Sequence, residues 1–308
     1  MGASFRLGLV GCGRISTAYF DALERLPEIE LAGVVDVRAD VRESVSEARK
    51  VNAYDSIDAL CAAEPGLEGV VICTPPALHA EQTIALLQKG LHVLCEKPFA
   101  LRMEEGEAML KAAEASDTLL MMASKFRYVP DIIEAKARIA SGALGKVHFY
   151  RNVFTARIDM RGRWNVDPGV AGGGVIMDNG THSVDIVRYL LGPIARIYAH
   201  ANPGVADLPV EDSATLLCVT ESNVLAHITL SWSVHVPTPN LIEVDGTEGA
   251  LRLGWKESTF KAVTAGEEQA YGTGYDKVQS FENQLRNFVQ SARGEAEPII
   301  TGRSGLHS

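Results

Sequence analysis

A lysine, an aspartate and a histidine stand out as groups that could act together on an alcohol. Lys97 follows the apolar run 91–95 and Glu96, and a proline comes next, as at the end of a buried parallel strand whose last residues project into a crevice. Asp178 and His182 are four residues apart and share one face if their segment is helical. These three side chains are enough to remove the proton of an alcohol and to stabilise the negative charge that develops on its oxygen.

The first 36 residues have the order of elements expected of a dinucleotide-binding unit. Apolar runs over 5–10 and 29–35 predict two strands, and the second ends at Asp36. A helical apolar pattern covers 19–26 between them. The glycines that follow the first strand permit a tight turn and let backbone amides approach a pyrophosphate at the helix N-terminus. The predicted cofactor contacts in this turn are Gly11, Cys12, Gly13, Arg14 and Ile15.

Asp36 bears on the choice between the two nicotinamide dinucleotides. An acid at the end of the second strand accepts hydrogen bonds from the adenosine ribose hydroxyls and repels a 2′-phosphate. The sequence therefore predicts NAD as the cofactor. Arg38, two residues later, could fold over a 2′-phosphate, so NADP stays open as the alternative and Arg38 is a further predicted cofactor contact.

Further cofactor contacts are predicted where later strands of the same sheet end. A buried strand over 70–73 stops at Thr74 and Pro75, and a helix starts at His79. All three are predicted to line the cofactor site, as are Glu96 and Lys97 at the next strand end. We expect Glu96 to orient Lys97 or the nicotinamide ribose rather than to act as a base.

Four motifs together resemble the glucose-fructose oxidoreductase / inositol dehydrogenase / MocA family. The Glu-Lys-Pro and Asp-x-x-x-His motifs are its specific part, and the resemblance covers nearly the whole chain. It implies a nicotinamide-dependent oxidoreductase acting on sugars, polyols or related hydroxy compounds. The segments that carry it are 11–15, 74–76, 96–98 and 172–182, with 125–128 and 144–147 in support.

The arrangement of predicted elements divides the chain into two domains. Strands alternate with helices over 1–125, which predicts an α/β domain with a doubly wound parallel sheet, the Rossmann fold. Residues 126–308 read as an α+β domain on a large, mostly antiparallel open sheet, with a helix over 174–191 inserted. The helices pack on one face of such a sheet, and a second subunit would most simply cover the other face. We therefore expect a homodimer or homotetramer. The strands expected in this sheet are 148–156, 195–201, 214–220, 224–234, 241–244 and 250–253.

Composition narrows the class of partner. The net charge of −10 argues against a nucleic-acid surface, and no apolar run of 18 residues could span a bilayer. The first strand starts at Phe5, which leaves no room for a signal peptide. The five cysteines are odd in number and form no C-x-x-C pair. We therefore expect a cytoplasmic enzyme with a small-molecule substrate, no nucleic acid and no membrane.

Charged residues within 157–185 are candidates for substrate contacts or a metal site. Three arginines over 157–163 could hold an anionic substrate, or Asp159 and Asp167 could neutralise them at the surface. Asp178, His182 and Asp185 share a helical face that could hold a metal, but Asp185 is expected to pair with Arg188 at i+3, so no metal is predicted. The predicted substrate contacts are Arg157, Trp164, Asn179 and His235.

The expected reaction is hydride transfer between nicotinamide and a secondary hydroxyl. His182, whose ordinary pKa is about 6.5, would take the hydroxyl proton, and Lys97 would stabilise the negative charge that develops on the oxygen. Asp178 would fix the substrate and support the protonated imidazole. Two rival functions stay open: a glycosidase that oxidises a sugar transiently, and a non-catalytic nucleotide sensor.

Overall fold

The computed structural model describes residues 3–202 and 204–308, which form two compact units. Unit 1 contains the chain up to Lys125 and the segment Lys277–His307, and unit 2 contains Phe126–Asp276 with Ser308. The chain thus leaves the first unit where the sequence placed the boundary. Residues 277–307 differ from the prediction, which assigned them to the second domain. They belong to unit 1 because Phe281 and Phe288 pack edge-on against Tyr19 and Phe5.

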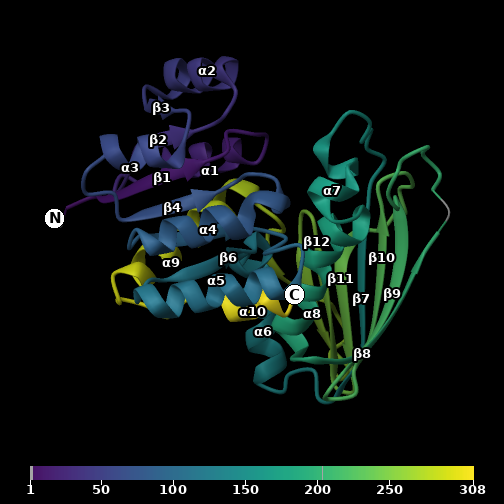
Figure 1. The fold of residues 1–308 in the computed structure, drawn as a ribbon. Coiled ribbons are helices and arrows are strands. Elements are labelled where there is room, and N and C mark those ends of the chain that lie inside the picture. Colours follow the sequence, from purple (N-terminus) through teal and green to yellow (C-terminus); the bar gives the residue numbers. More distant parts are fainter. Residues whose placement is uncertain (1–2, 203) are drawn as a thin grey trace. The chain divides into compact units, whose positions relative to one another are not determined.

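Unit 1 is the predicted doubly wound domain, with six parallel strands in the order β3-β2-β1-β4-β5-β6 (Figure 1). Helices α1 and α9 contact each other, as do α4 and α5, so that helix pairs cover the sheet. The strands are β1 (Phe5–Val10), β2 (Ile29–Val35), β3 (Asn52–Tyr54), β4 (Gly69–Ile72), β5 (His92–Glu96) and β6 (Leu120–Ala123). The helices are α1 (Ser16–Leu23), α2 (Ala39–Arg49), α3 (Ile57–Ala63), η1 (Pro76–Leu78), α4 (His79–Gln88), α5 (Met103–Ser116), α9 (Lys277–Ala292) and α10 (Gly302–Leu306).

The central strands of unit 1 are apolar along their whole length because both faces of the sheet are covered. Every residue of β4 is buried, and Val93 to Cys95 in β5 have no exposed surface. Pairing places Val10 of β1 beside Ile72 of β4, and Ile72 beside Cys95 of β5. This row marks the carboxyl edge of the sheet, where the candidate site residues of unit 1 begin.

Unit 2 is built on an eight-stranded sheet in the order β14-β13-β12-β11-β7-β10-β9-β8, in which only the β7–β10 pair is parallel among the described pairings. Its strands are β7 (Val147–Thr155), β8 (Ile194–Ala201), β9 (Ser213–Thr220), β10 (Leu225–Ser231), β11 (Asn240–Gly246), β12 (Gly249–Gly254), β13 (Ser258–Ala262) and β14 (Gln269–Gly272). Its helices are η2 (Lys125–Tyr128), α6 (Pro130–Ala140), η3 (Trp164–Val166), α7 (Pro168–Ala171), the π-helical turn η4 (Ile176–Gly180) and α8 (Thr181–Leu191).

The predicted mostly antiparallel sheet is confirmed, but β13 and β14 extend it beyond the strands expected from the sequence. Both are short and largely polar, with the sequences STFKA and QAYG, so neither has the apolar alternation that marks a strand. Their strand conformation comes from pairing with β12 and with each other.

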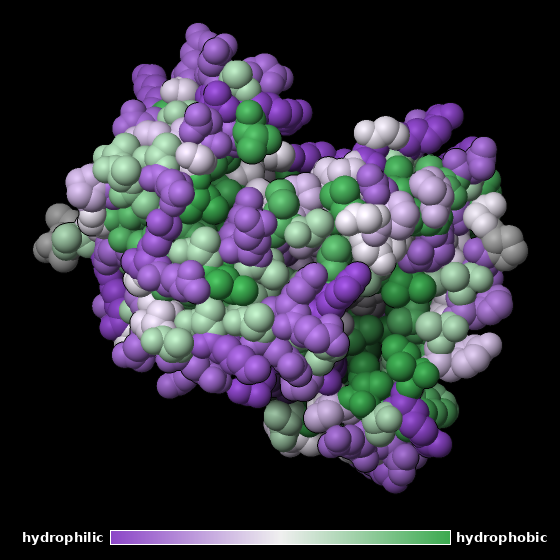
Figure 2. Space-filling model, viewed as in Figure 1, coloured by the Kyte–Doolittle hydropathy of each residue, from purple (hydrophilic) through white to green (hydrophobic). Residues whose placement is uncertain are grey.

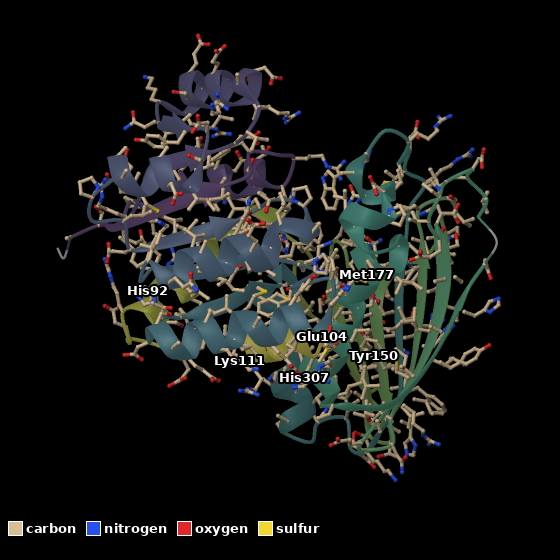
Figure 3. The ribbon with its side chains drawn as sticks, viewed as in Figure 1. His92, Glu104, Lys111, Tyr150, Met177 and His307 are labelled. Carbon is tan, nitrogen blue, oxygen red and sulfur yellow. The ribbon has the colours of Figure 1, made fainter. Side chains whose placement is uncertain are left out.

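Alternation along the strands gives the sheet of unit 2 two different faces. Tyr150 of β7, Ile228 of β10 and Val244 of β11 are buried in the core that also contains Ile186 of α8; Figure 3 labels Tyr150. Figure 2 shows hydrophobic residues gathered on the visible surface of unit 2, whereas α5 presents mainly hydrophilic ones. In the part of the chain that the structure describes, no helix is long and apolar enough to cross a bilayer.

A buried ion pair in unit 2 corrects one prediction. The predicted pair of Asp185 with Arg188 is wrong: Asp185 pairs with Arg127. The Arg127 Nη2 lies 2.6 Å from Oδ1 of Asp185, and its Nε lies 2.9 Å from Oδ2. Ser308 donates a further hydrogen bond to the same carboxylate. Asp185 faces the interior of unit 2, so a guanidinium that is distant in sequence reaches both of its oxygens, which suits the planar fork of arginine.

We expect Arg127→Met to destabilise unit 2, because Asp185 would stay fully buried without its main counter-charge. Removing one partner of a buried pair costs about 3–5 kcal/mol, and urea denaturation should show a loss of that order in the free energy of unfolding. Arg161→Met is the control, since its pair with Asp159 is exposed and should contribute far less to stability. Equal losses in the two variants would contradict the assignment.

Candidate active site

The glycine turn of unit 1 needs its two glycines for different reasons. Gly11 has φ +92°, and a Cβ there would lie 2.8 Å from the backbone of Cys73 and Thr74. A Cβ on Gly13 would meet no atom of residues 3–202 or 204–308 within 4 Å. Packing within the protein therefore does not explain Gly13, whereas the close approach of a pyrophosphate to the turn does. The turn thus fits the phosphates of a dinucleotide.

Asp36 is fixed beside this turn. Its Oδ2 accepts the amide hydrogen of Cys12 at 2.9 Å, and its Oδ1 accepts that of Arg38 at 3.0 Å. The carboxylate is therefore held in one orientation at the end of β2, as the ribose of an adenosine requires. The Arg38 guanidinium lies 3.7 Å from Oδ1 and is largely exposed.

The other residues of the turn differ in exposure. Arg14 is exposed, and Ile15 is half-buried directly before α1. Burial, with a smaller effect of the Asp36 charge, raises the pKa of the Cys12 thiol to about 12. Cys12 is thus a neutral thiol at physiological pH and adds no negative charge where phosphates would bind.

His79 links two turns at the carboxyl edge of the sheet. Its Nδ1 lies 2.8 Å from the carbonyl oxygen of Pro98, and its Nε2 lies 2.8 Å from that of Thr74. The imidazole is fully buried, and this burial lowers its pKa despite the two carbonyl partners. A role of His79 in binding the cofactor stays a prediction; its contacts hold together the turn that contains Pro75 and the turn after Lys97.

Glu96 and Lys97 lie at the end of β5 and differ in their surroundings. Glu96 is buried, and its Oε2 accepts the amide hydrogen of Lys97 at 3.1 Å. Lys97 is half-buried. Because β1, β4 and β5 are parallel neighbours, Lys97 lies at the same sheet edge as the glycine turn, about 10 Å away at the usual spacing between strands.

Asp178 and His182 are positioned by an irregular helix in unit 2. The helix expected over 174–191 contains a π-helical turn, η4, that carries Asp178, and His182 is the second residue of α8. Figure 3 labels Met177 in the same turn. π-helical turns inside helices occur often at functional sites. The sequence did not reveal this one, because a π-helical turn has no residue type that marks it.

Glu211 holds the start of this helix and was not found from the sequence. Its carboxylate accepts the amide hydrogens of Gly174 and Ile176 at 3.0 Å, and its carbonyl oxygen accepts that of Val175 at 2.9 Å. A Cβ on Gly174 would lie 2.0 Å from this carbonyl oxygen, which explains the glycine. The free amide hydrogens and the dipole at a helix start favour a nearby carboxylate, so the sequence allows an acid to be expected there. The spacing could not show which of the 39 acidic residues it is.

His182 lies within a cluster of aromatic side chains in unit 2. Its ring is 8% exposed and meets Phe126 edge-on at 5.0 Å. Tyr275 stacks on Phe126 at 5.2 Å, and Trp255 contacts both Phe154 and Tyr275. These rings come from four separate parts of the sequence, so no local motif signals the cluster. Phe126 and Phe154 pack against the imidazole itself, so that little of it is exposed to water.

Two of the predicted substrate contacts lie at one edge of the second sheet. Arg157 follows β7 and His235 follows β10, and both are exposed. The two segments stay paired beyond the strands, since Ile158 donates its amide hydrogen to Trp232 O at 2.7 Å. The parallel pairing of β7 and β10 thus brings Arg157 and His235 to the same edge.

The remaining predicted contacts lie nearby in sequence. Trp164 begins η3 and is 44% exposed, and Asn179 shares the π-helical turn with Asp178. Asp159 neutralises Arg161 through two hydrogen bonds, which lower the pKa of this carboxyl to about 2. The alternative of surface neutralisation therefore holds for Arg161. Asp167 instead accepts the amide hydrogen of Gly169 and begins α7.

Both units match one protein family. Residues 5–124 match the domain described as "Oxidoreductase family, NAD-binding Rossmann fold", and residues 132–252 match the "GFO/IDH/MocA C-terminal domain". The chain therefore belongs to the GFO/IDH/MocA oxidoreductase family, as its motifs indicated.

Individual relatives span nearly the whole chain. D-apiose dehydrogenase of Paraburkholderia graminis is 28% identical over 98% of this chain and 84% of its own length. Inositol 2-dehydrogenase of Rhizobium meliloti is 27% identical over 98% of this chain and 92% of its own. A solved structure of aldose-aldose oxidoreductase from Caulobacter crescentus, complexed with glycerol, superposes with a TM-score of 0.87 at 25% identity and covers 99% of this chain and 94% of that one.

We expect Asp36→Ala to narrow the difference between the two cofactors. The change removes a carboxylate that repels a 2′-phosphate, so kcat/KM should fall for NAD and rise for NADP. The measurement is kcat/KM with each cofactor for both proteins. Glu43→Ala, an exposed acid of α2, should leave the ratio unchanged. A wild-type protein that prefers NADP would contradict the role given to Asp36.

Proposed function

We propose that the protein is an NAD-dependent oxidoreductase that transfers hydride between nicotinamide and a secondary hydroxyl or ketone of a sugar, polyol or sugar derivative. The family membership supports the reaction type. The two relatives reported above are named for such substrates, D-apiose and inositol. NADP stays the alternative cofactor; NAD is favoured because Asp36 is fixed at the turn, whereas Arg38 is exposed.

The position of Lys97 is the observation that carries this proposal. Lys97 directly follows β5 of unit 1. It therefore lies at the same edge of the sheet as the glycine turn, whose shape suits a dinucleotide. Open parallel sheets bind their ligands at this edge. A cation there can stabilise negative charge on a substrate oxygen as hydride leaves the adjacent carbon.

In the proposed mechanism, Lys97 and His182 act on the same substrate hydroxyl. The nicotinamide cofactor, when bound, supplies the hydride acceptor. His182 takes the hydroxyl proton on an imidazole nitrogen, and Lys97 donates a hydrogen bond to the same oxygen. The aromatic cluster around His182 keeps water from competing for that nitrogen. In the reverse direction His182 returns the proton and a ketone is reduced.

Asp178 has two tasks in this proposal. It accepts hydrogen bonds from substrate hydroxyls, and its negative charge stabilises the imidazolium form of His182, one turn further along the helix. Glu211 supports both residues indirectly by holding the helix start at Gly174. The dehydrogenase reading is favoured over a transiently oxidising glycosidase by the names of both relatives, and over a sensor by the presence of all three reactive groups.

The proposed function is tested with a panel of sugars and polyols. Purified protein is mixed with NAD and each compound, and the absorbance of the reduced cofactor is followed. Steady net reduction of NAD with at least one hydroxy compound is the expected result. Cleavage of a glycoside without net reduction would indicate the glycosidase, and binding of cofactor without turnover of any compound would indicate the sensor.

We expect Lys97→Ala and His182→Ala each to lower kcat by about 10²-fold or more, the lower range of acid–base contributions. The double variant should lose much less than the product of the two factors, because groups that act as one unit are non-additive. NAD binding should change little in His182→Ala, since that residue belongs to unit 2. Near-normal kcat in either single variant would place the chemistry elsewhere, with residues 157–164 as the next candidates.

We propose further that the protein forms a homodimer, or a tetramer built from dimers, through the outer face of the second sheet. Phe149, Leu225 and Leu217 project from this face with more than half of their surface exposed. Pairing places Phe149 directly beside Leu225. The same face carries both positive and negative side chains, such as the paired Arg151 and Glu243. Two copies related by a twofold axis would therefore present opposite charges to each other. A cytoplasmic location stays a prediction of the sequence.

Leu225→Arg combined with Leu217→Arg should convert the assembly to monomers, because two charges per chain would be buried at the contact. Light scattering coupled to size exclusion measures the mass. Val205→Arg introduces the same charge at an exposed position of a loop and should leave the mass unchanged. A wild-type protein that is monomeric at micromolar concentration would rule out this interface.

A further inference from the structure

A chain of hydrogen bonds in unit 1 ends at the backbone of Lys97. Gln284 of α9 donates from Nε2 to the Tyr19 hydroxyl at 3.1 Å, and Tyr19 of α1 donates to Glu96 Oε1 at 2.8 Å. The other oxygen of Glu96 accepts the amide hydrogen of Lys97. Tyr19 and Gln284 have no exposed surface, and Glu96 has 8%. Three elements distant in sequence therefore converge on the residue before the proposed catalytic lysine.

The Glu96 carboxylate depends on these partners for its charge. Burial raises its pKa, while the hydrogen bond from Tyr19 and the positive charges of Lys97 and Lys125 act in the opposite direction. The other titratable groups facing it are Tyr19 and the thiols of Cys73 and Cys95. The pKa of each of these is raised, chiefly by burial, so they are neutral near pH 7. Tyr19 is thus a neutral donor whose hydrogen bond lowers the pKa of Glu96 against the effect of burial.

Gln284 is placed for this donation rather than for packing alone. Its Oε1 is buried and has no hydrogen-bond partner among residues 3–202 and 204–308. A buried amide oxygen without a partner is costly and uncommon in proteins. An apolar side chain at this position would avoid the cost of a buried, unpaired oxygen. The hydrogen bond that the Gln284 amide donates to Tyr19 therefore explains why the residue is a glutamine.

We propose that Tyr19 and Gln284 are positioning residues for Lys97: they keep Glu96 a carboxylate, and Glu96 fixes the Lys97 amide and so the direction in which the lysine leaves the strand. The inference rests on the proposed function, in which Lys97 contacts the substrate oxygen. A protonated Glu96 would lose an acceptor lone pair and the charge that strengthens the bond to the Lys97 amide. The orientation of Lys97 is then coupled to the charge of a residue that touches no substrate.

Tyr19→Phe isolates the hydroxyl, since the ring that packs edge-on against Phe281 at 4.7 Å is kept. Tyr54→Phe is the matched control: its hydroxyl donates to Glu64 at 2.6 Å in the same unit, and neither residue belongs to the proposed site. Gln284→Met removes only the outer donor and is a milder second variant.

The first readout is the backbone amide resonance of Lys97 in protein labelled with ¹⁵N-lysine, assigned by its absence in Lys97→Arg. We expect the chemical shift of this amide to change with pH as Glu96 is protonated, and to lose this pH dependence in Glu96→Gln. In Tyr19→Phe the midpoint should rise by about one pH unit, the tenfold effect of a hydrogen bond to a charged group, and by less in Gln284→Met. Tyr54→Phe should behave as wild type. An unchanged midpoint in Tyr19→Phe would overturn the proposal.

The second readout is the pH dependence of kcat. Because a higher pKa of Glu96 leaves it protonated over a wider range, Tyr19→Phe should lose about tenfold in kcat on the acid side and recover toward alkaline pH. A loss that is equal at all pH values would indicate a structural role and overturn the proposal. If no hydroxy compound is oxidised by the wild type, the proposed function fails, and the amide titration still decides whether Tyr19 controls Glu96 and Lys97.

Discussion

The hydrogen-bond register across the parallel sheet decides where every candidate group of unit 1 lies. Val35, Val10, Ile72 and Cys95 form one row across β2, β1, β4 and β5. Asp36, Gly11 and Glu96 each follow this row by one residue, so Asp36, the glycine turn and the strand end before Lys97 are fixed relative to one another by backbone pairing. A slip of one residue in any pair would turn these groups to the wrong face.

Carboxylates do much of the positioning in both units without taking part in chemistry. Asp36 holds the amide of Cys12 in the glycine turn, Glu96 holds that of Lys97, and Glu211 holds those at the start of the helix that carries His182. Asp185 instead fixes a guanidinium beneath that helix. In each case a charged acceptor binds groups of the chain more strongly than a neutral one would, which suits sites that must keep their geometry.

Unit 2 supplies a dry, rigid setting for an imidazole. The π-helical turn brings Asp178 within one turn of His182, and the rings of Phe126 and Phe154 pack against the histidine. A general base gains from such a setting because solvent does not compete for its nitrogen. The polar edge formed after β7 and β10 carries Arg157 and His235, so polar and apolar groups are separated within the unit.

The sequence by itself determined the Rossmann order of unit 1, the mostly antiparallel second sheet, the glycine turn with Asp36, and the family. These follow from local signals: apolar periodicity, glycine at a turn, and acids at strand ends. The tertiary structure alone decided that Lys277–His307 returns to unit 1, that Asp185 pairs with Arg127, and that Glu211, Tyr19, Gln284 and the aromatic cluster lie around the predicted site residues. Each of these joins residues far apart in the chain through burial, and no spacing in the sequence encodes which distant partner fills a buried position.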